Sequence, residues 1–132
     1  MNHVFYSDGD AKKISWLIQT NDSTSEQNRD HAEIYKDKVT KLQSKYIALH
    51  VGIFWCIGTF IIKNEDEVIV NLDSKAMYDH LIQNTVSQVE FIETRTGFLK
   101  QLISQRKLKV NYQFIESEKN LALELLKKRI GT

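Results

Sequence analysis

The sequence predicts an α/β fold built on a five-stranded mixed sheet with helices on both faces. Three early stretches with strand composition, residues 3–6, 13–20 and 31–39, are expected to pair antiparallel. Two later ones, residues 67–72 and 107–115, alternate with helical patterns. Because helical crossovers join parallel strands, we expect these two to run parallel to the first strand, with residues 67–72 between the other two.

The early strands are separated by polar segments. The first ends in the turn sequence SDGD at residues 7–10, and the second reads KISWLIQT at 13–20. Residues 21–30, NDSTSEQNRD, are polar throughout and are expected to form a loop. Residues 31–39 alternate apolar and polar side chains, which predicts a third strand at a sheet edge with one face in solvent.

An apolar pattern at residues 40–62 predicts the main helix of the fold. Apolar side chains recur at steps of three and four residues, at Ile47, Val51, Phe54, Ile57 and Ile61. We expect Phe54, Ile57 and Ile61 to be buried against the sheet.

The stretch EVIVNLDSKAMYDHL at residues 67–81 joins a strand to a helix. Residues 67–72 are mostly β-branched and apolar, Ser74 is expected to cap the helix, and residues 75–81 have helical spacing. Asp73 stands between the two elements, and a carboxylate at the carboxyl end of a buried strand is well placed to bind a ligand. The same residue fits a simple capping role, and the pattern alone leaves both interpretations open.

The remaining residues predict two further helices and the last strand. A helix is expected at 86–105, with inward-facing Val89, Ile92, Leu99, Leu102 and Ile103. The strand at 107–115 leads through a polar loop at 116–120 to a final helix from residue 121 to 130, which ends at Gly131.

Composition indicates an ordinary globular chain, with residues 1–132 as one domain. Of the 132 residues, 42% are hydrophobic and 27% are charged, and the formal net charge of +1 does not by itself indicate a nucleic-acid binder. The single cysteine, Cys56, excludes a disulfide framework within one chain and fits a reducing compartment. The polar start MNHVFYSDGD does not resemble a signal peptide, and the apolar run at 47–62 is short for a membrane span, so we expect a cytoplasmic protein.

Other chemically interesting residues fit structural roles. His3, His31, His50 and His80 do not have metal-ligand spacing, and Trp16 and Trp55 are expected in the core. The basic run 127–129 could contact phosphates but also suits the solvated carboxyl end of a helix.

Several strings in this order resemble the ribonuclease H superfamily, specifically its small single-domain, reverse-transcriptase-like members. The strings are YSDG at 6–9, KYIALHVGI at 45–53, DS at 73–74 with Leu81, VNY at 110–112 and KNLA at 119–122. The resemblance spans nearly the whole chain and implies a ribonuclease H-like fold.

The resemblance also implies a carboxylate site that is incomplete in this chain. Family enzymes hold two divalent metals with four carboxylates and cleave the RNA of an RNA/DNA hybrid. Asp8 and Asp73 match two of these catalytic and metal-binding positions, whereas Lys45 stands at the glutamate position and Leu123 at the last aspartate position. The family's hybrid-reading asparagine pair falls on Lys41 and Leu42.

These replacements have two interpretations. In the first, Lys45 pairs with Asp8 or Asp73, and Leu123 extends an apolar stripe, so that the site has become packing and a salt bridge. In the second, a rebuilt metal site recruits nearby carboxylates, for which the sequence offers Asp10, Glu116, Glu118 and Glu124. A bound metal is not expected under the first interpretation, and Mg²⁺ or Mn²⁺ is expected under the second.

The sequence therefore predicts a catalytically impaired ribonuclease H-like protein that retains nucleic-acid binding, with an RNA/DNA hybrid as the ligand to test. The expected contact residues are Lys41, Lys45, Ser74 and Lys75. One alternative is an active divalent-metal-dependent ribonuclease H with rearranged carboxylates. The other is a protein-interaction module that has kept only the fold. No membrane partner is expected, and the pattern does not indicate an oligomeric state.

Overall fold

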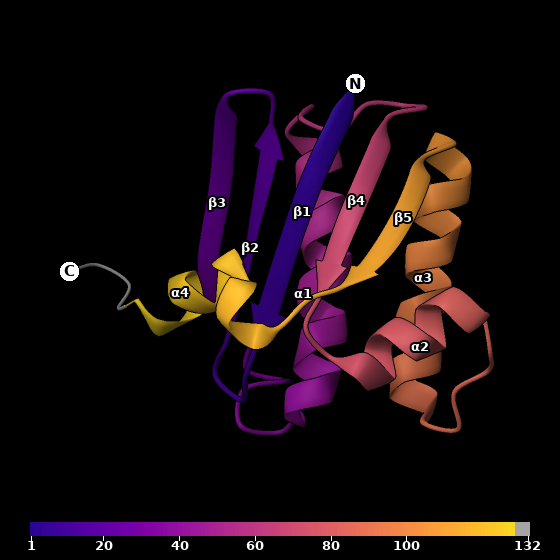
Figure 1. Ribbon diagram of the computed structural model, residues 1–132. Helices are drawn as coiled ribbons and strands as arrows, with labels where there is room; N and C mark the ends of the chain where they lie inside the picture. Colours follow the sequence, from indigo (N-terminus) through magenta and orange to yellow (C-terminus); the bar gives the residue numbers. More distant parts are fainter. Residues whose placement is uncertain (129–132) are drawn as a thin grey trace.

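The computed structural model describes residues 1–128 and contains a five-stranded sheet in the order β3-β2-β1-β4-β5 (Figure 1). The strands are β1 (Asn2–Gly9), β2 (Lys13–Thr20), β3 (Ser23–Asp30), β4 (Glu67–Leu72) and β5 (Lys109–Phe114). The first three pair antiparallel, whereas β4 runs parallel to both β1 and β5. The predicted mixed sheet is confirmed, and so is the place of β4 between the first and last strands.

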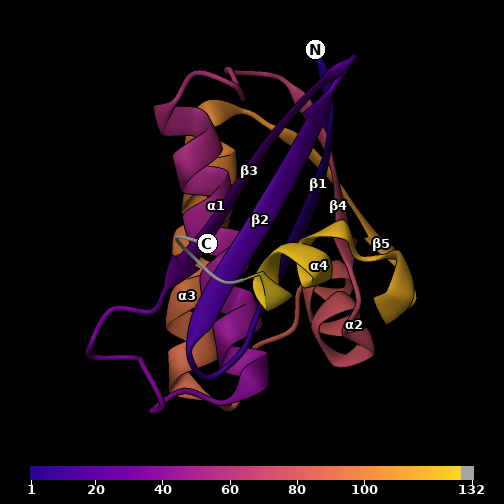
Figure 2. The ribbon, with the colours of Figure 1, turned by 90° about the vertical axis from the view of Figure 1, so that its left-hand side faces the viewer.

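Helices cover both faces of this sheet, as predicted. They are α1 (Lys41–Gly58), α2 (Lys75–Gln83), α3 (Glu90–Arg106), the short 3₁₀ turn η1 (Ser117–Lys119) and α4 (Leu121–Lys127). Figure 2 shows α1 and α3 on one face and α4 on the other, while α2 packs beside β4 and β5. No helix within residues 1–128 is long and apolar enough to cross a membrane.

The third strand was predicted in the wrong place. Residues 21–30, expected to be a loop, contain β3, whereas residues 31–39, expected to be a strand, form turns. The polar β3 is an edge strand whose pairing is set by the tight turn after β2, where Asn21 has a φ of 52°. The apolar alternation at 31–39 does not reflect burial on one face, since Ile34 is 69% exposed.

Helix α1 lies on the sheet through a different face from the one expected. Thr40 caps it in a capping box with Gln43. The prediction for Phe54 was wrong, because its side chain is 63% exposed, and Ile57 and Ile61 are only partly buried. The helix is apolar nearly all round between residues 46 and 58, so the spacing of apolar residues did not identify its buried side.

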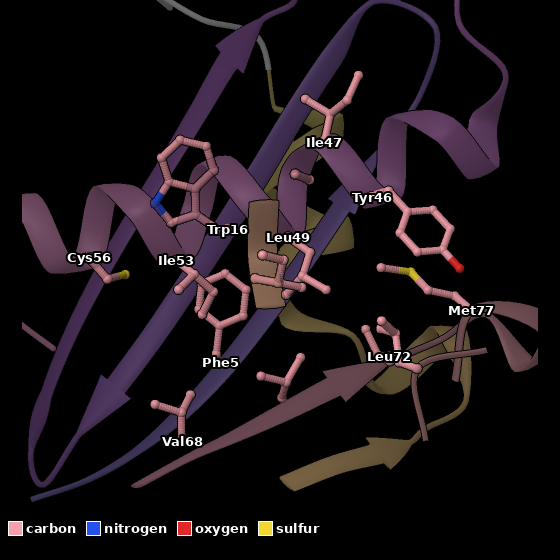
Figure 3. Packing of buried hydrophobic residues seen from close by; sticks show 14 of the residues in the cluster. Phe5, Trp16, Tyr46, Ile47, Leu49, Ile53, Cys56, Val68, Leu72 and Met77 are labelled. Atoms are coloured by element: carbon pink, nitrogen blue, oxygen red, sulfur yellow. The ribbon is translucent and has the colours of Figure 1, made fainter. Parts of the chain in front are cut away.

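The buried side of α1 meets the sheet at Gly52. A Cβ on Gly52 would lie 2.6 Å from the Phe5 ring and 3.0 Å from Trp16, so only glycine allows this approach. Tyr46, Leu49, Ile53 and Cys56 extend the contact on either side, and Figure 3 shows Leu49 and Ile53 beside Phe5, with Tyr46 farther along beside Met77.

The later elements follow the prediction with shifted ends. Ser74 caps α2 as expected, by accepting a hydrogen bond from the backbone of Met77. Helix α3 begins at Glu90 rather than at residue 86, so Val89 is 45% exposed instead of inward, while Ile92 and Leu99 are buried as predicted. The predicted end of the last helix, at residues 130–131, lies outside the described residues.

Candidate functional site

Two carboxylates meet where β1 and β4 end. Asp8 is the penultimate residue of β1, and Asp73 directly follows β4. Because β1 and β4 are parallel neighbours, their carboxyl ends share one edge of the sheet. The side chains of Asp8 and Asp73 are only 1% and 4% exposed, so both negative charges need partners inside the protein.

Lys45, near the start of α1, supplies a partner for both. Its Nζ donates to Asp8 Oδ1 at 2.8 Å and to Asp73 Oδ1 at 2.6 Å, and the lysine side chain is 12% exposed. Burial by itself would lower the pKa of Lys45, but its hydrogen bonds to Asp73 and Asp8 and the negative charges of these aspartates outweigh burial, so that the pKa is raised. The predicted ion pair is present, and it joins Lys45 to both aspartates.

Gly9 allows α1 to come this close to β1. A Cβ on Gly9 would lie 2.3 Å from Ser44 Oγ and 2.8 Å from the Ser44 carbonyl oxygen. Ser44 is fully buried, and its hydroxyl is 2.7 Å from His31 Nε2. The glycine after Asp8 therefore allows α1 to lie close to the end of β1, so that Lys45, the residue after Ser44, reaches Asp8 and Asp73.

Asn120 completes the polar cluster, and we did not predict its role from the sequence. Its Nδ2 donates to Asp73 Oδ2 and to the Ser7 carbonyl, both at 3.0 Å, while its Oδ1 accepts from the backbone of Ala122 and so caps α4. An asparagine between a polar loop and an apolar helix is the signal of an N-cap. That signal can predict the capping role of Asn120 but not its contact with Asp73.

Leu123, which the resemblance matches to the family's last aspartate, is half-buried. The fully buried residues of α4 are its neighbours Ala122, Leu125 and Leu126. Leu123 cannot bind a metal, since its side chain has no polar atom.

The carboxylates offered for a rebuilt site do not gather around Asp8 and Asp73. Asp10 Oδ1 accepts from the backbone of Lys12 and Lys13 in the turn after β1, and Glu116, Glu118 and Glu124 are exposed. Within residues 1–128, no three His, Cys, Asp or Glu side chains form a group that could hold a metal ion.

The donor set at the strand ends therefore does not fit the pair of divalent metals that the resemblance implies. Among residues 1–128, Asp8 Oδ2 is buried without a hydrogen-bond partner, and the other three carboxylate oxygens of Asp8 and Asp73 each accept a hydrogen bond. Each Mg²⁺ takes an octahedral set of oxygen ligands, and the Lys45 ammonium lies in hydrogen-bond contact with both aspartates.

Two exposed lysines and the amino ends of two helices lie near this edge of the sheet. Lys41 is exposed at the start of α1, and Lys75 is exposed at the start of α2, where it pairs with Asp79 at 2.9 Å. Ser74 Oγ is used to cap α2. Neither helix has an acidic residue in its first turn, although Asp73 directly precedes the Ser74 cap of α2. The positive ends of the helix dipoles of α1 and α2 are directed toward this edge.

The four histidines lie apart, as their spacing predicted. His3 contacts Asp66 and Thr20, His31 contacts Ser44, His50 contacts Arg95, and His80 contacts Tyr46. Trp16 and Cys56 are in the core, and burial raises the pKa of the Cys56 thiol to about 12. Trp55 is only partly buried, and of the basic run 127–129, Lys127 and Lys128 are exposed and Arg129 lies outside the described residues.

Comparison of the structure with solved proteins identifies the fold. The chain is similar to RNase H1 from Halobacterium salinarum, with a TM-score of 0.72 and 12% identity, over 95% of this chain and 92% of that one. The fold is ribonuclease H-like. The N-terminal RNase H domain of a Mycobacterium tuberculosis protein gives a TM-score of 0.75 and 16% identity over 96% and 95% of the two chains. No protein-family model and no curated protein matches the sequence.

Some structures similar to this ribonuclease H-like chain were solved with nucleic acid. LC11-RNase H1, from a compost metagenome, was crystallised in complex with an RNA/DNA hybrid. It shares 19% identity and a TM-score of 0.72 over 93% of this chain and 92% of its own. Foamy viral protease-reverse transcriptase, also solved with a hybrid, matches 91% of this chain with 16% of its own length at a TM-score of 0.53 and 11% identity.

Proposed function

We propose that this chain is a ribonuclease H-like domain that binds nucleic acid, with an RNA/DNA hybrid as its first ligand, and that it has lost metal-dependent cleavage. One observation carries the proposal: the Lys45 ammonium is hydrogen-bonded to both Asp8 and Asp73. It supports two conclusions, one about the metals and one about phosphate.

The first conclusion concerns cleavage. Two-metal hydrolysis needs carboxylates that hold two cations close together. Here a protein cation is held between the two aspartates, and its raised pKa keeps it charged at neutral pH. Coulomb repulsion from Lys45 opposes a divalent ion at the same place. Leu123 supplies no ligand to compensate.

The second conclusion concerns binding. Asp8, Asp73 and Lys45 together carry a net charge of −1, so this edge repels a phosphate less than a site of four carboxylates does. The amino ends of α1 and α2 point positive partial charge toward the same edge, and Lys41 and Lys75 add two exposed ammonium groups. A nucleic-acid backbone can therefore approach without bridging metal ions.

Fluorescence anisotropy with a labelled RNA/DNA hybrid, duplex DNA and duplex RNA tests this binding. We expect hybrid binding that persists in EDTA and weakens with increasing salt, because phosphate contacts release counterions. Lys41→Glu should weaken binding. Lys100→Glu, a reversal of another exposed lysine on α3, is the matched control and should not weaken binding. If the protein binds none of the three ligands at low salt, the nucleic-acid proposal fails and the protein-interaction alternative gains support.

A further inference from the structure

An open hollow lined by β3, α1 and α3 contains two arginines. Arg29 comes from β3 and Arg95 from α3, while Ile47 and Val51 of α1 supply apolar wall. The volume of this hollow is about 270 Å³. Neither guanidinium lies within 4 Å of a carboxylate among residues 1–128. The hollow therefore presents two positive charges to an anion from outside the chain.

Neutral neighbours restrain both guanidinium groups. The guanidinium carbon of Arg29 lies 5.1 Å from the centre of the Trp16 ring. Arg95 Nη2 donates to the Tyr35 hydroxyl at 2.9 Å, and Arg95 Nη1 is 3.1 Å from His50 Nδ1. Burial and the charge of Arg95 lower the pKa of His50, so His50 is neutral and accepts this bond. Since a guanidinium has five N–H donors, Arg95 keeps donors for an anion.

A second, aromatic hollow of about 430 Å³ adjoins the first and shares Tyr35 and Arg95 with it. Phe91 and Phe98 add two rings to its walls, and Phe98 is 52% exposed. The Arg95 guanidinium carbon lies 5.6 Å from the centre of the Tyr35 ring and 5.7 Å from that of Phe91. Because the two hollows share two residues, one ligand can place an anion in the first and a flat ring in the second.

Two carboxylates also stand in these walls, and they narrow the choice of ligand. Asp30 lines the arginine hollow and Glu90 lines the aromatic one. A carboxylate repels a bare anion but accepts hydrogen bonds from hydroxyl and amino groups. A ligand that suits both hollows therefore carries an anion, a flat ring and hydrogen-bond donors. A nucleoside monophosphate has all three, in its phosphate, its base and its ribose hydroxyls.

We propose that these two adjoining hollows form a binding site for a free nucleoside monophosphate. Arg29 and Arg95 bind the phosphate, since the planar fork of a guanidinium matches two phosphate oxygens. The base contacts the rings of Tyr35 and Phe98. The residues at the ends of β1 and β4 take no part, so this site is independent of the proposed nucleic-acid function.

Titration with adenosine 5′-monophosphate, followed by ¹H–¹⁵N correlation spectra, tests the site and locates it. We expect the backbone amide signals of Asp30, Tyr35 and Arg95 to shift, and those of Asp8 and Asp73 to stay in place. The dissociation constant should lie between about 10 µM and 1 mM. Adenosine lacks the anion and ribose 5-phosphate lacks the ring, so each should bind at least about tenfold more weakly.

Two variants and a control test the arginines. Arg29→Gln and Arg95→Gln should each raise the dissociation constant of adenosine 5′-monophosphate at least about tenfold, because each removes charged hydrogen bonds to the phosphate. Arg106→Gln replaces an exposed arginine at the end of α3 and should leave the constant unchanged. Arg29 is exposed, so Arg29→Gln decides alone if circular dichroism shows that Arg95→Gln is unfolded.

Several results would overturn the proposal. One is a spectrum that does not change up to about 5 mM adenosine 5′-monophosphate. Another is a set of shifts confined to the ends of β1 and β4, which would mean that the nucleotide binds at the edge proposed for nucleic acid. Equal affinities for the nucleotide and for ribose 5-phosphate would contradict the role of the aromatic hollow. An unchanged affinity in Arg29→Gln would contradict the role of the arginines.

Discussion

Replacing Lys45 by methionine should strongly destabilise the fold, because it removes the cation that Asp8 and Asp73 share. The substitution keeps an unbranched apolar stem of similar size but removes the ammonium, leaving two carboxylates that are 1% and 4% exposed without their shared cation. Removing one partner of a buried ion pair costs about 3–5 kcal/mol. We take the lower half of that range, because Asp73 keeps its Asn120 contact and Asp8 keeps that of the Gly9 amide.

Urea unfolding at pH 7, followed by circular dichroism, measures this loss directly. Lys75→Met removes a lysine whose side chain is 63% exposed from an ion pair at the start of the neighbouring helix. That control should change the free energy of unfolding by less than about 1 kcal/mol. A loss below about 1 kcal/mol for Lys45→Met would show that the ion pair does not hold the strand ends together.

The pH dependence of the same experiment has a definite sign. The folded-state pKa of Lys45 is raised above its ordinary value of 10.5, so folding favours the charged form. Its contribution to stability is fully present below pH 10.5 and is lost as pH rises through the folded-state pKa. The difference in unfolding free energy between wild type and Lys45→Met should therefore shrink at strongly alkaline pH.

Four further variants probe the core and the site. Ile53→Ala, on the buried side of α1, should cost about 2–5 kcal/mol in urea melts, whereas Phe54→Ala should cost less than about 1 kcal/mol; equal losses would contradict this orientation of the helix. Asn120→Ala should cost about 1–3 kcal/mol in the same melts, because it unpairs the Ser7 carbonyl and one Asp73 oxygen; no loss would show that α4 is held elsewhere. Lys45→Glu combined with Leu123→Asp should create Mn²⁺ binding measurable by calorimetry that Lys45→Met lacks, and equal binding by both variants would count against the carboxylate argument.

The sequence predicts the strands that are apolar and buried much better than those that are not. Glu67–Leu72 and Lys13–Thr20 were expected with the bounds that they have. The edge strand Ser23–Asp30 has no apolar pattern, because its side chains are largely exposed and its backbone pairing with β2 makes it a strand. Pairing of this kind is set by the tertiary structure and leaves little trace in the local sequence.

Three residues of the candidate site could be predicted from the sequence, whereas the role of Asn120 could not. Asp8 and Lys45 lie on regular elements and Asp73 directly follows one, so the meeting of these three residues followed from the family resemblance. Asn120 lies on a short loop, and its hydrogen bond to Asp73 depends on how α4 docks against β1 and β2. The orientation of α1 depended on Gly52, whose lack of a Cβ allows contact with Phe5 and Trp16.

Cleavage by the wild-type protein tests the central claim most directly. The purified chain is incubated with an end-labelled RNA/DNA hybrid in Mg²⁺ and separately in Mn²⁺, and the products are separated on a sequencing gel. Because Lys45 is held between Asp8 and Asp73, we expect no cleavage above that of a buffer blank with either metal. Metal-dependent cleavage that disappears in Asp73→Asn would contradict the account, and Asp10, Glu116, Glu118 and Glu124 would then be the first ligands to mutate.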